Sequence, residues 1–117
     1  MKVRHEVLGP VTLLCAEGRL DFGSAPGFQR EIEAVLAGGG TAPTGVIVDC
    51  TALEYVSSAG LRVLLQAARA ARQGKISFAL CALKPAVREV FELSGFDRLM
   101  DVHADRATAL AHGSQGP

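Results

Sequence analysis

The chain has 117 residues, which at about 150 residues per domain is one domain, and 49% of them are hydrophobic, enough to build a core and to exclude intrinsic disorder. Twelve lysines and arginines balance twelve aspartates and glutamates, so the net charge at pH 7 is zero, without the positive charge of a dedicated nucleic-acid binder or a polybasic membrane anchor. No apolar run is long enough for a transmembrane helix and the first residues do not form a signal peptide, so a cytoplasmic protein is expected.

The first two elements are predicted to be a pair of strands. Residues 11–16 form a short apolar run that opens after Gly9-Pro10 and closes at Gly18, which is typical of a strand. Residues 3–8 precede the same turn, so we expect them to pair with this strand as a hairpin.

A helix is predicted next, beginning at Ser24 or Ala25, because the proline that follows is common in a first helical turn. Its apolar residues recur with helical spacing on one face: Phe28, Ile32, Val35 and Leu36. Residues 38–40 are three glycines that end this helix. They are interpreted as a flexible connector, because a phosphate-binding loop would follow a strand and precede a Lys-Ser/Thr pair.

Strands and helices alternate in the rest of the chain. Residues 45–49 are β-branched without alternation, as in a strand covered on both faces. A helix with an apolar stripe is predicted from the Ser57-Ser58 pair to Gly74. The remaining predicted elements are a strand at 76–81, a helix from Pro85 to Ser94-Gly95, a strand at 99–102 and a helix at 105–112.

This order predicts the fold class. Strands that are joined by helices imply parallel crossover connections. The chain is therefore expected to be a single α/β domain over residues 1–112, with a mixed, mostly parallel sheet of about five strands and about four helices packed on it. Residues 113–117 are predicted to be a disordered tail.

The residues favour neither an enzyme nor a metal site. The histidines are scattered, and no G-x-S-x-G motif surrounds the serines, so we expect no catalytic residue, cofactor or metal. The three cysteines lie far apart and are expected to be buried free thiols: Cys15, Cys50 and Cys81. Three arginines are expected on the solvated side of the helix that begins near residue 58: Arg62, Arg69 and Arg72.

The turn at residues 57–60 is the strongest candidate site. A helix that begins there has unpaired backbone N–H groups and the positive end of its dipole at its start. Serine hydroxyls in this place commonly cap the helix. A phosphate on a first-turn serine would be tolerated by the same groups, and it would make a neutral surface anionic while the fold is kept. The local residues leave both roles open.

Four stretches in order make the chain resemble the STAS domain of bacterial anti-sigma factor antagonists. They are Gly18-Arg19-Leu20-Asp21, residues 46–65 with the Ser-Ser-Ala-Gly turn, residues 83–87 and Leu93-Ser94-Gly95-Phe96. Together they extend the resemblance over nearly the whole chain. The resemblance implies a single-domain binding protein without catalytic activity.

Members of this family bind an anti-sigma factor, often a serine kinase of the histidine-kinase-like ATPase fold, and so free a sigma factor. The kinase phosphorylates a serine of the switch loop, which abolishes binding, and a PP2C-type phosphatase restores it. The resemblance thus implies a cytoplasmic phosphoprotein that switches partners. We expect it to be a monomer that binds neither nucleic acid nor a membrane.

The chain departs from the usual Asp-Ser-Ser-Gly tetrad of the family, in which the second serine is phosphorylated. Aligned on Gly60, Ala59 stands at the acceptor position and Ser57 at the aspartate position. We therefore expect phosphorylation at Ser58, with Ser57 as the reserve acceptor and otherwise a helix cap. Without phosphorylation the domain would be a constitutive binder.

The partner-binding surface is predicted to comprise Asp21, Ser57, Ser58, Ala59, Gly60, Leu61 and Arg62. Gly60 would allow the backbone of a partner to approach closely, because it has no side chain. Asp21 would add repulsion after phosphorylation, or would simply bond its own turn. For Leu61 the alternative is core packing.

Two other functions stay open. The chief alternative is a STAS subunit without a phosphoswitch, which acts as a scaffold in a stress-signalling or transport assembly. A hydrolase built on Ser58 ranks last, because no histidine stands at an expected place in the sequence.

Overall fold

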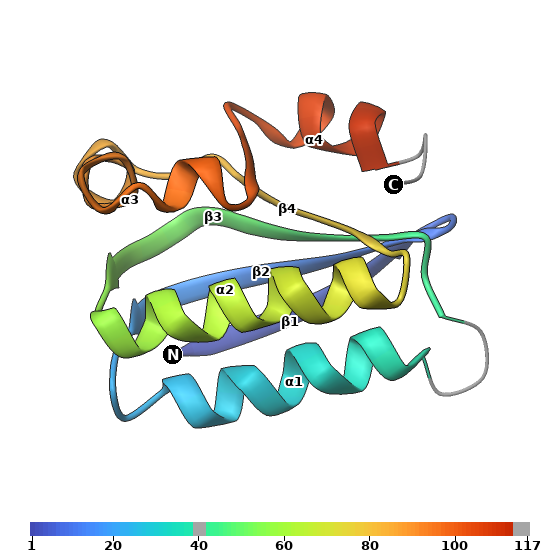
Figure 1. Ribbon diagram of the computed structural model, residues 1–117, viewed down its shortest axis with the longest axis horizontal. Coiled ribbons are helices and arrows are strands. Elements are labelled where there is room, and N and C mark those ends of the chain that lie inside the picture. The colour runs from blue at the N-terminus through green and yellow to red at the C-terminus, as the bar shows by residue number, and fades with distance from the viewer. Residues whose placement is uncertain (39–41, 114–117) are drawn as a thin grey trace.

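The computed structural model describes residues 1–38 and 42–113, and within them a five-stranded sheet carries helices on both faces (Figure 1). The strands are β1 (Lys2–Leu8), β2 (Val11–Leu20), β3 (Gly45–Val56), β4 (Ser77–Cys81) and β5 (Asp101–His103). The helices are α1 (Ala25–Ala37), α2 (Ser58–Gln73), α3 (Pro85–Ser94) and α4 (Arg106–Gly113), with the short 3-10 helix η2 (Phe96–Arg98) before β5. The predicted single α/β domain with a mixed sheet is confirmed.

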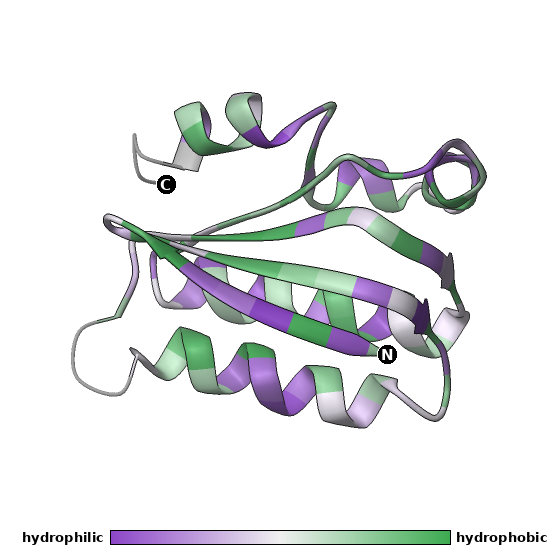
Figure 2. Cartoon of the chain, turned by 180° about the vertical axis from the view of Figure 1, so that it is seen from behind, coloured by the Kyte–Doolittle hydropathy of each residue, from purple (hydrophilic) through white to green (hydrophobic). Residues whose placement is uncertain are grey.

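The strands lie in the sheet in their order along the chain. β1 pairs antiparallel with β2 across the Gly9-Pro10 turn, as predicted, while β2, β3, β4 and β5 are parallel neighbours. Parallel neighbours need crossover connections, which contain α1, α2 and α3. Figure 2 shows hydrophilic residues along the edge strand β1 and a mostly hydrophobic β3, which is the pattern of a central strand covered on both faces.

Two hydrophobic clusters hold the layers together. The larger one joins the sheet to α1, α2 and α3 through residues such as Phe28, Leu64 and Phe91. The smaller one lies between the sheet and α4, and its members include Leu13, Ile47 and Ala109. In Figure 1, α1 and α2 lie on one side of the sheet and α4 lies on the other. The helical spacing that predicted α1 therefore marked the side that enters the larger cluster.

Three predicted boundaries are wrong. β2 continues past Gly18 to Leu20, because Gly18 takes a positive φ of 96° and the register against β3 shifts directly after it. The glycine thus accommodates an irregularity in the ladder instead of ending the strand. β3 runs on to Val56, well beyond the predicted strand at 45–49. β5 begins later than predicted, because Leu99 keeps helical backbone angles after η2.

Two smaller predictions, on the end of α1 and on the cysteines, are confirmed. Gly38 ends α1 in a left-handed conformation, while residues 39 and 40 of the predicted connector lie outside the described residues, as do residues 114–117 of the predicted tail. The three cysteines are buried and free, and burial raises the pKa of the Cys81 thiol to about 11, which makes it unreactive. In the described part of the chain, no helix is both long and apolar enough to cross a membrane.

Candidate functional site

The β3–α2 turn lies at the end of the molecule where β2 and β3 finish and where α1 and α2 begin (Figure 1). The register places Leu20, the last residue of β2, beside Val56, the last residue of β3. The loop after β2 and the turn after β3 are therefore neighbours, although they are more than thirty residues apart in the chain. This arrangement brings Asp21 to the same end of the molecule as residues 57–60.

Ser57 is the cap of α2. Its backbone is extended, and its Oγ accepts a hydrogen bond of 3.2 Å from the N–H of Gly60. Its own N–H donates to the carbonyl oxygen of Leu20 over 2.9 Å. The cap that the serine-rich turn predicted is thus confirmed at Ser57, and a second hydrogen bond ties the turn to the end of β2.

Ser58 is the first residue of α2, and its side chain is exposed. Among the described residues, none makes a hydrogen bond to its hydroxyl group. The backbone N–H groups of a first helical turn have no carbonyl partner within the helix, so an anion at Ser58 would meet donors there. The two serines therefore differ: the hydroxyl of Ser57 is used by the fold, and that of Ser58 is free.

Gly60 is buried against β2. A Cβ atom added to Gly60 would lie 2.7 Å from both the Cγ and the carbonyl oxygen of Leu20, which is closer than atoms can approach. The close approach that this glycine permits is therefore to Leu20 of the same chain. Leu61 is only 7% exposed and belongs to the larger cluster. Both residues thus have a packing role, and a contact of either with a partner stays a prediction.

Asp21 organises the neighbouring loop between β2 and α1. Its Oδ1 accepts hydrogen bonds from the N–H groups of Gly23 and Ser24, each 3.1 Å long, and from the hydroxyl of Ser24 at 3.3 Å. These hydrogen bonds, above all the one from the Ser24 N–H, lower the pKa of the Asp21 carboxyl. The role of Asp21 in its own turn is confirmed. Its predicted repulsion of a partner stays a prediction.

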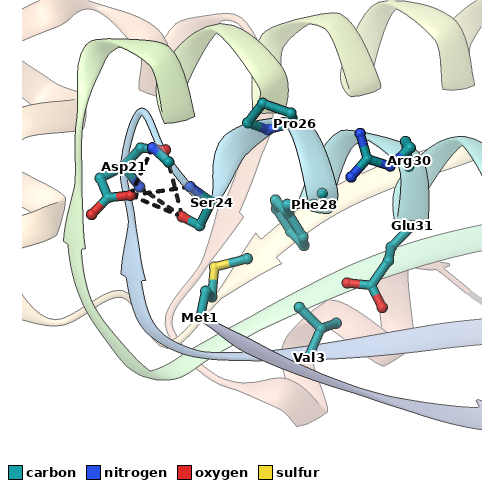
Figure 3. A pocket seen from close by; sticks show the side chains of 10 residues that line it. Met1, Val3, Asp21, Ser24, Pro26, Phe28, Arg30 and Glu31 are labelled. Carbon is teal, nitrogen blue, oxygen red and sulfur yellow. Dashed lines mark hydrogen bonds between the residues drawn. The ribbon is translucent and has the colours of Figure 1, made fainter.

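A cavity of about 600 Å³ adjoins this loop (Figure 3). It lies between the N-terminal half of α1 and the start of β1, and Asp21 and Ser24 line it together with Met1 and Val3. Neither Ser57 nor Ser58 is among its lining residues. The cavity is therefore a neighbour of the β3–α2 turn and not a part of it.

Three exposed side chains beside the turn are absent from the predicted surface. Phe22 is 84% exposed in the loop after β2. Arg19 pairs with Tyr55 in the register of β2 and β3, and its guanidinium carbon lies 4.2 Å from the centre of the Tyr55 ring. Exposed aromatic and arginine side chains are enriched at the centres of protein interfaces. In the sequence, Phe22 is a large apolar residue directly after Asp21 in a loop of otherwise small residues. This contrast could have identified it as an exposed contact residue.

Arg62 completes the surface that the described residues form around the turn. It lies one helical turn after Ser58 on α2, is exposed, and takes part in none of the ion pairs of the described residues. Its predicted solvated position is confirmed. In the described ranges, no group of three or more histidine, cysteine, aspartate or glutamate side chains could hold a metal ion.

Comparison with known proteins gives one consistent result. A family model described as the STAS domain matches residues 2–109. A protein of Bordetella bronchiseptica that is named as the anti-sigma factor antagonist BtrV is 37% identical over 111 residues, which cover 95% of this chain and 93% of that one.

Solved structures agree with the sequence comparison. An anti-sigma factor antagonist from Mycobacterium paratuberculosis is 25% identical, with a TM-score of 0.83 over 97% of this chain and 93% of that one. The Thermotoga maritima protein TM1081 is 18% identical, with a TM-score of 0.87 over 96% and 94% of the two chains, which shows the shared fold.

Proposed function

The chain belongs to the STAS domain family, and we propose that it is an anti-sigma factor antagonist that binds an anti-sigma factor and thereby releases a sigma factor. The relative named BtrV supports this function, because the similarity covers nearly the whole length of both proteins. The binding surface that we propose is the end of the molecule around the β3–α2 turn. There, Phe22, Tyr55 and Arg19 offer exposed aromatic and cationic groups beside Ser58.

Phosphorylation of Ser58 is the proposed switch that ends this binding. The observation that carries the proposal is the exposed hydroxyl group of Ser58, which has no hydrogen bond among the described residues and lies on the first residue of α2. A kinase can reach it without disturbing the cap. Phosphorylation of Ser57, the reserve acceptor, would require its Oγ to leave the N–H of Gly60.

A phosphate on Ser58 would change the surface and leave the fold intact. It would add a charge of about −2 next to the free N–H groups of the first turn and one turn before Arg62, so the isolated domain would tolerate it. The turn itself is fixed by the hydrogen bond from Ser57 to Leu20 and by the packing of Gly60 on the same residue. In a complex, the phosphate would be buried against the partner, where it would face groups of like charge or lack a cationic group to pair with. The partner that fits the unphosphorylated surface would therefore dissociate.

The chain supplies the hydroxyl group and the binding surface, and the chemistry belongs to its partners. In the proposed cycle, a serine kinase of the histidine-kinase-like ATPase fold transfers the γ-phosphoryl group of ATP to Oγ of Ser58, with loss of the hydroxyl proton and release of ADP. A PP2C-type phosphatase hydrolyses the phosphate ester and restores binding. We place this cycle in the cytoplasm, because bacterial sigma factors act there.

Intact-mass spectrometry tests the switch. The protein and its Ser57→Ala and Ser58→Ala variants are incubated with ATP and an anti-sigma factor kinase from the same organism. We expect a mass increase of about 80 Da, the mass of one phosphate, in the unmutated protein and in Ser57→Ala but not in Ser58→Ala. An increase that is lost only in Ser57→Ala would move the acceptor by one residue.

Binding is measured in parallel by titration calorimetry with the same kinase. Ser58→Glu is expected to bind more weakly than Ser58→Ala, because glutamate adds a negative charge at the proposed contact. Unchanged mass with intact binding would overturn the switch and leave a constitutive STAS binding module. Absence of binding for every variant would overturn the proposed partner.

A further inference from the structure

A second cavity lies at the end of α2 that is distant from Ser58. We call it the β4-edge cavity; its volume is about 750 Å³, and it is lined by the last turns of α2, the turn into β4, η2 and β4 itself. β5 pairs only with residues 79–81 of β4, so the first residues of β4, Ser77 and Phe78, have no strand on that side. The short last strand therefore leaves the sheet edge open at this cavity.

The lining of the β4-edge cavity carries an excess of positive charge. Its basic side chains are Arg69, Arg72, Lys75 and Arg98, and its acidic side chains are Asp97 and Asp101. The chain as a whole has no net charge, so this excess is local. None of the four basic residues takes part in an ion pair of the described residues. Their charges are available to an anion.

The floor of the same cavity is apolar. Phe78 and Met100 line it and are each only 7% exposed, and Leu65 and Ala68 of α2 line it as partly buried residues. Arg69 and Arg72 lie three residues apart on α2, so they stand next to each other on one helix face. A ligand with an anionic group and an apolar body would match both parts of the cavity.

Two histidines give an independent observation. His103 and His112 both line the cavity, and their rings stack with centres 4.7 Å apart. Nε2 of His103 is buried and has no hydrogen-bond partner among the described residues. Buried ring nitrogens in folded proteins normally have a partner, so this atom calls for an explanation. An oxygen atom of a ligand would be such a partner.

Lys75 adds a backbone feature at the rim. Its φ is 58°, in the left-handed region that residues with a Cβ atom rarely adopt. Gly74, which would take this conformation without strain, stands one position earlier and keeps a negative φ. The N–H of Ile76 donates to the carbonyl oxygen of Ala71 and the N–H of Lys75 donates to that of Arg72, so the left-handed residue closes the end of α2 and fixes Lys75 at the rim.

We propose that the β4-edge cavity binds a small organic phosphate with an apolar or aromatic body. Guanidinium groups bind phosphate oxygens in pairs, and a phosphate monoester carries a charge of about −2, which suits the local excess better than a single carboxylate does. The site lies at the opposite end of α2 from Ser58. It is therefore a second function of the domain, independent of the proposed switch.

Proton NMR of the histidine rings tests the proposal, with naphthyl phosphate as the probe. The chain has three histidines, and His5 on β1 does not line the cavity, so its resonance is an internal reference. We expect saturable shifts of the His103 and His112 resonances and none for His5, with assignments from single His→Gln variants. Inorganic phosphate has only the anionic group and naphthol has only the aromatic body, so each is expected to bind at least about tenfold more weakly than naphthyl phosphate.

Two variants locate the site. The double variant Arg69→Gln, Arg72→Gln is expected to weaken binding of naphthyl phosphate by about tenfold or more, because it removes charged donors but keeps residues that favour a helix. Arg88→Gln is the matched control, since Arg88 is an exposed helical arginine outside both the cavity and the proposed partner surface, and it should bind as the unmutated protein does. Circular dichroism confirms that both variants are folded.

Three outcomes of the NMR experiments would overturn the proposal. They are the absence of histidine shifts up to the solubility limit of the probe, equal binding by the double variant, and equal shifts for His5. Flotation with vesicles of phosphatidylcholine and phosphatidic acid separates a soluble ligand from a lipid headgroup. Binding to these vesicles without any response to naphthyl phosphate would also overturn the proposed soluble ligand.

Discussion

The two faces of the sheet are held by different forces. On the face of α1 and α2, the larger cluster is apolar throughout and includes Phe28, which is only 1% exposed. On the face of α4, a smaller cluster is accompanied by a buried carboxylate, because Asp49 is only 6% exposed. The β3–α2 turn belongs to the apolar face, so its position does not depend on an ion pair.

The polar contacts on the α4 face converge on Asp49. Its Oδ2 accepts hydrogen bonds from Nη2 and Nε of Arg106 on α4, at 2.8 and 3.1 Å, and its Oδ1 accepts from the Thr51 hydroxyl at 2.6 Å. Arg106 also lies 3.6 Å from Glu6 on β1. We therefore expect that charge or pH can loosen α4 while the β3–α2 turn stays in place. Four sets of substitutions test this separation.

The largest effect is expected for Phe28→Ala on the apolar face. The substitution removes a buried aromatic side chain and leaves a cavity, so it should lower the free energy of unfolding by about 3–5 kcal/mol. Urea unfolding measures the change. Phe22→Ala is the control, since Phe22 is exposed, and its effect should stay within about 0.5 kcal/mol. Similar losses for both would contradict the assignment of the core.

Gly60→Ala should be the next most disruptive change. The added Cβ would overlap the backbone oxygen of Leu20, which cannot move aside as a flexible side chain can, and the expected loss is about 1–3 kcal/mol. Gly27→Ala on α1 is the matched control, because a Cβ there meets only Arg30 at 3.8 Å and alanine favours a helix. Thermal unfolding compares them. An unchanged Gly60→Ala would disprove the close approach of α2 to β2.

Asp49→Asn should lower the free energy of unfolding by about 1–2 kcal/mol, because it weakens the attachment of α4 to the sheet. The expected loss is smaller than for a fully buried ion pair, because solvent reaches Arg106. Burial by itself would raise the pKa of Asp49, but the hydrogen bonds from Thr51 and Arg106 outweigh it and lower the pKa below its ordinary value. The contribution of Asp49 is therefore present at neutral pH and is lost as the pH falls below about 4.

Urea unfolding of the unmutated protein and of Asp49→Asn between neutral and acid pH measures this difference. The two proteins should converge at low pH, whereas Glu89→Gln, a change at an exposed residue of α3, should be neutral throughout. Because the β3–α2 turn is on the other face, Asp49→Asn should leave the proposed phosphorylation and the proposed partner binding unchanged. A difference in the free energy of unfolding that is the same at every pH would contradict an ionised Asp49 paired with Arg106.

The smallest effects separate the two serines. Ser57→Ala removes the oxygen that caps α2 and should cost about 1 kcal/mol. Ser58→Ala removes an exposed hydroxyl without a hydrogen bond in the described structure and should stay within about 0.5 kcal/mol. Thermal unfolding of the two variants side by side measures the difference. The reverse order would contradict the assignment of Ser57 as the cap of α2.

Local patterns explain why most of the fold could be predicted. Glycine and proline mark the turns of the chain, and apolar spacing distinguishes strand from helix within a few residues. The predictions of the hairpin, of the apolar face of α1 and of the alternation of strands and helices were therefore correct. The ends of β2 and β3 were missed for a physical reason. A bulge after Gly18 lets both strands continue through residues that look like a turn, and only their mutual pairing makes that continuation favourable.

The sequence by itself determined the fold class, the position of the serine turn at the start of α2 and the residues from which a switch could be built, because these depend on neighbours within one or two helical turns. Only the tertiary structure decided that the N–H of Ser57 binds the carbonyl oxygen of Leu20, that Gly60 contacts Leu20 and that Arg106 binds Asp49 across 57 positions of the chain. The physical reason is that such contacts depend on how strands register and layers stack, and no local pattern records which distant residue fills a given place.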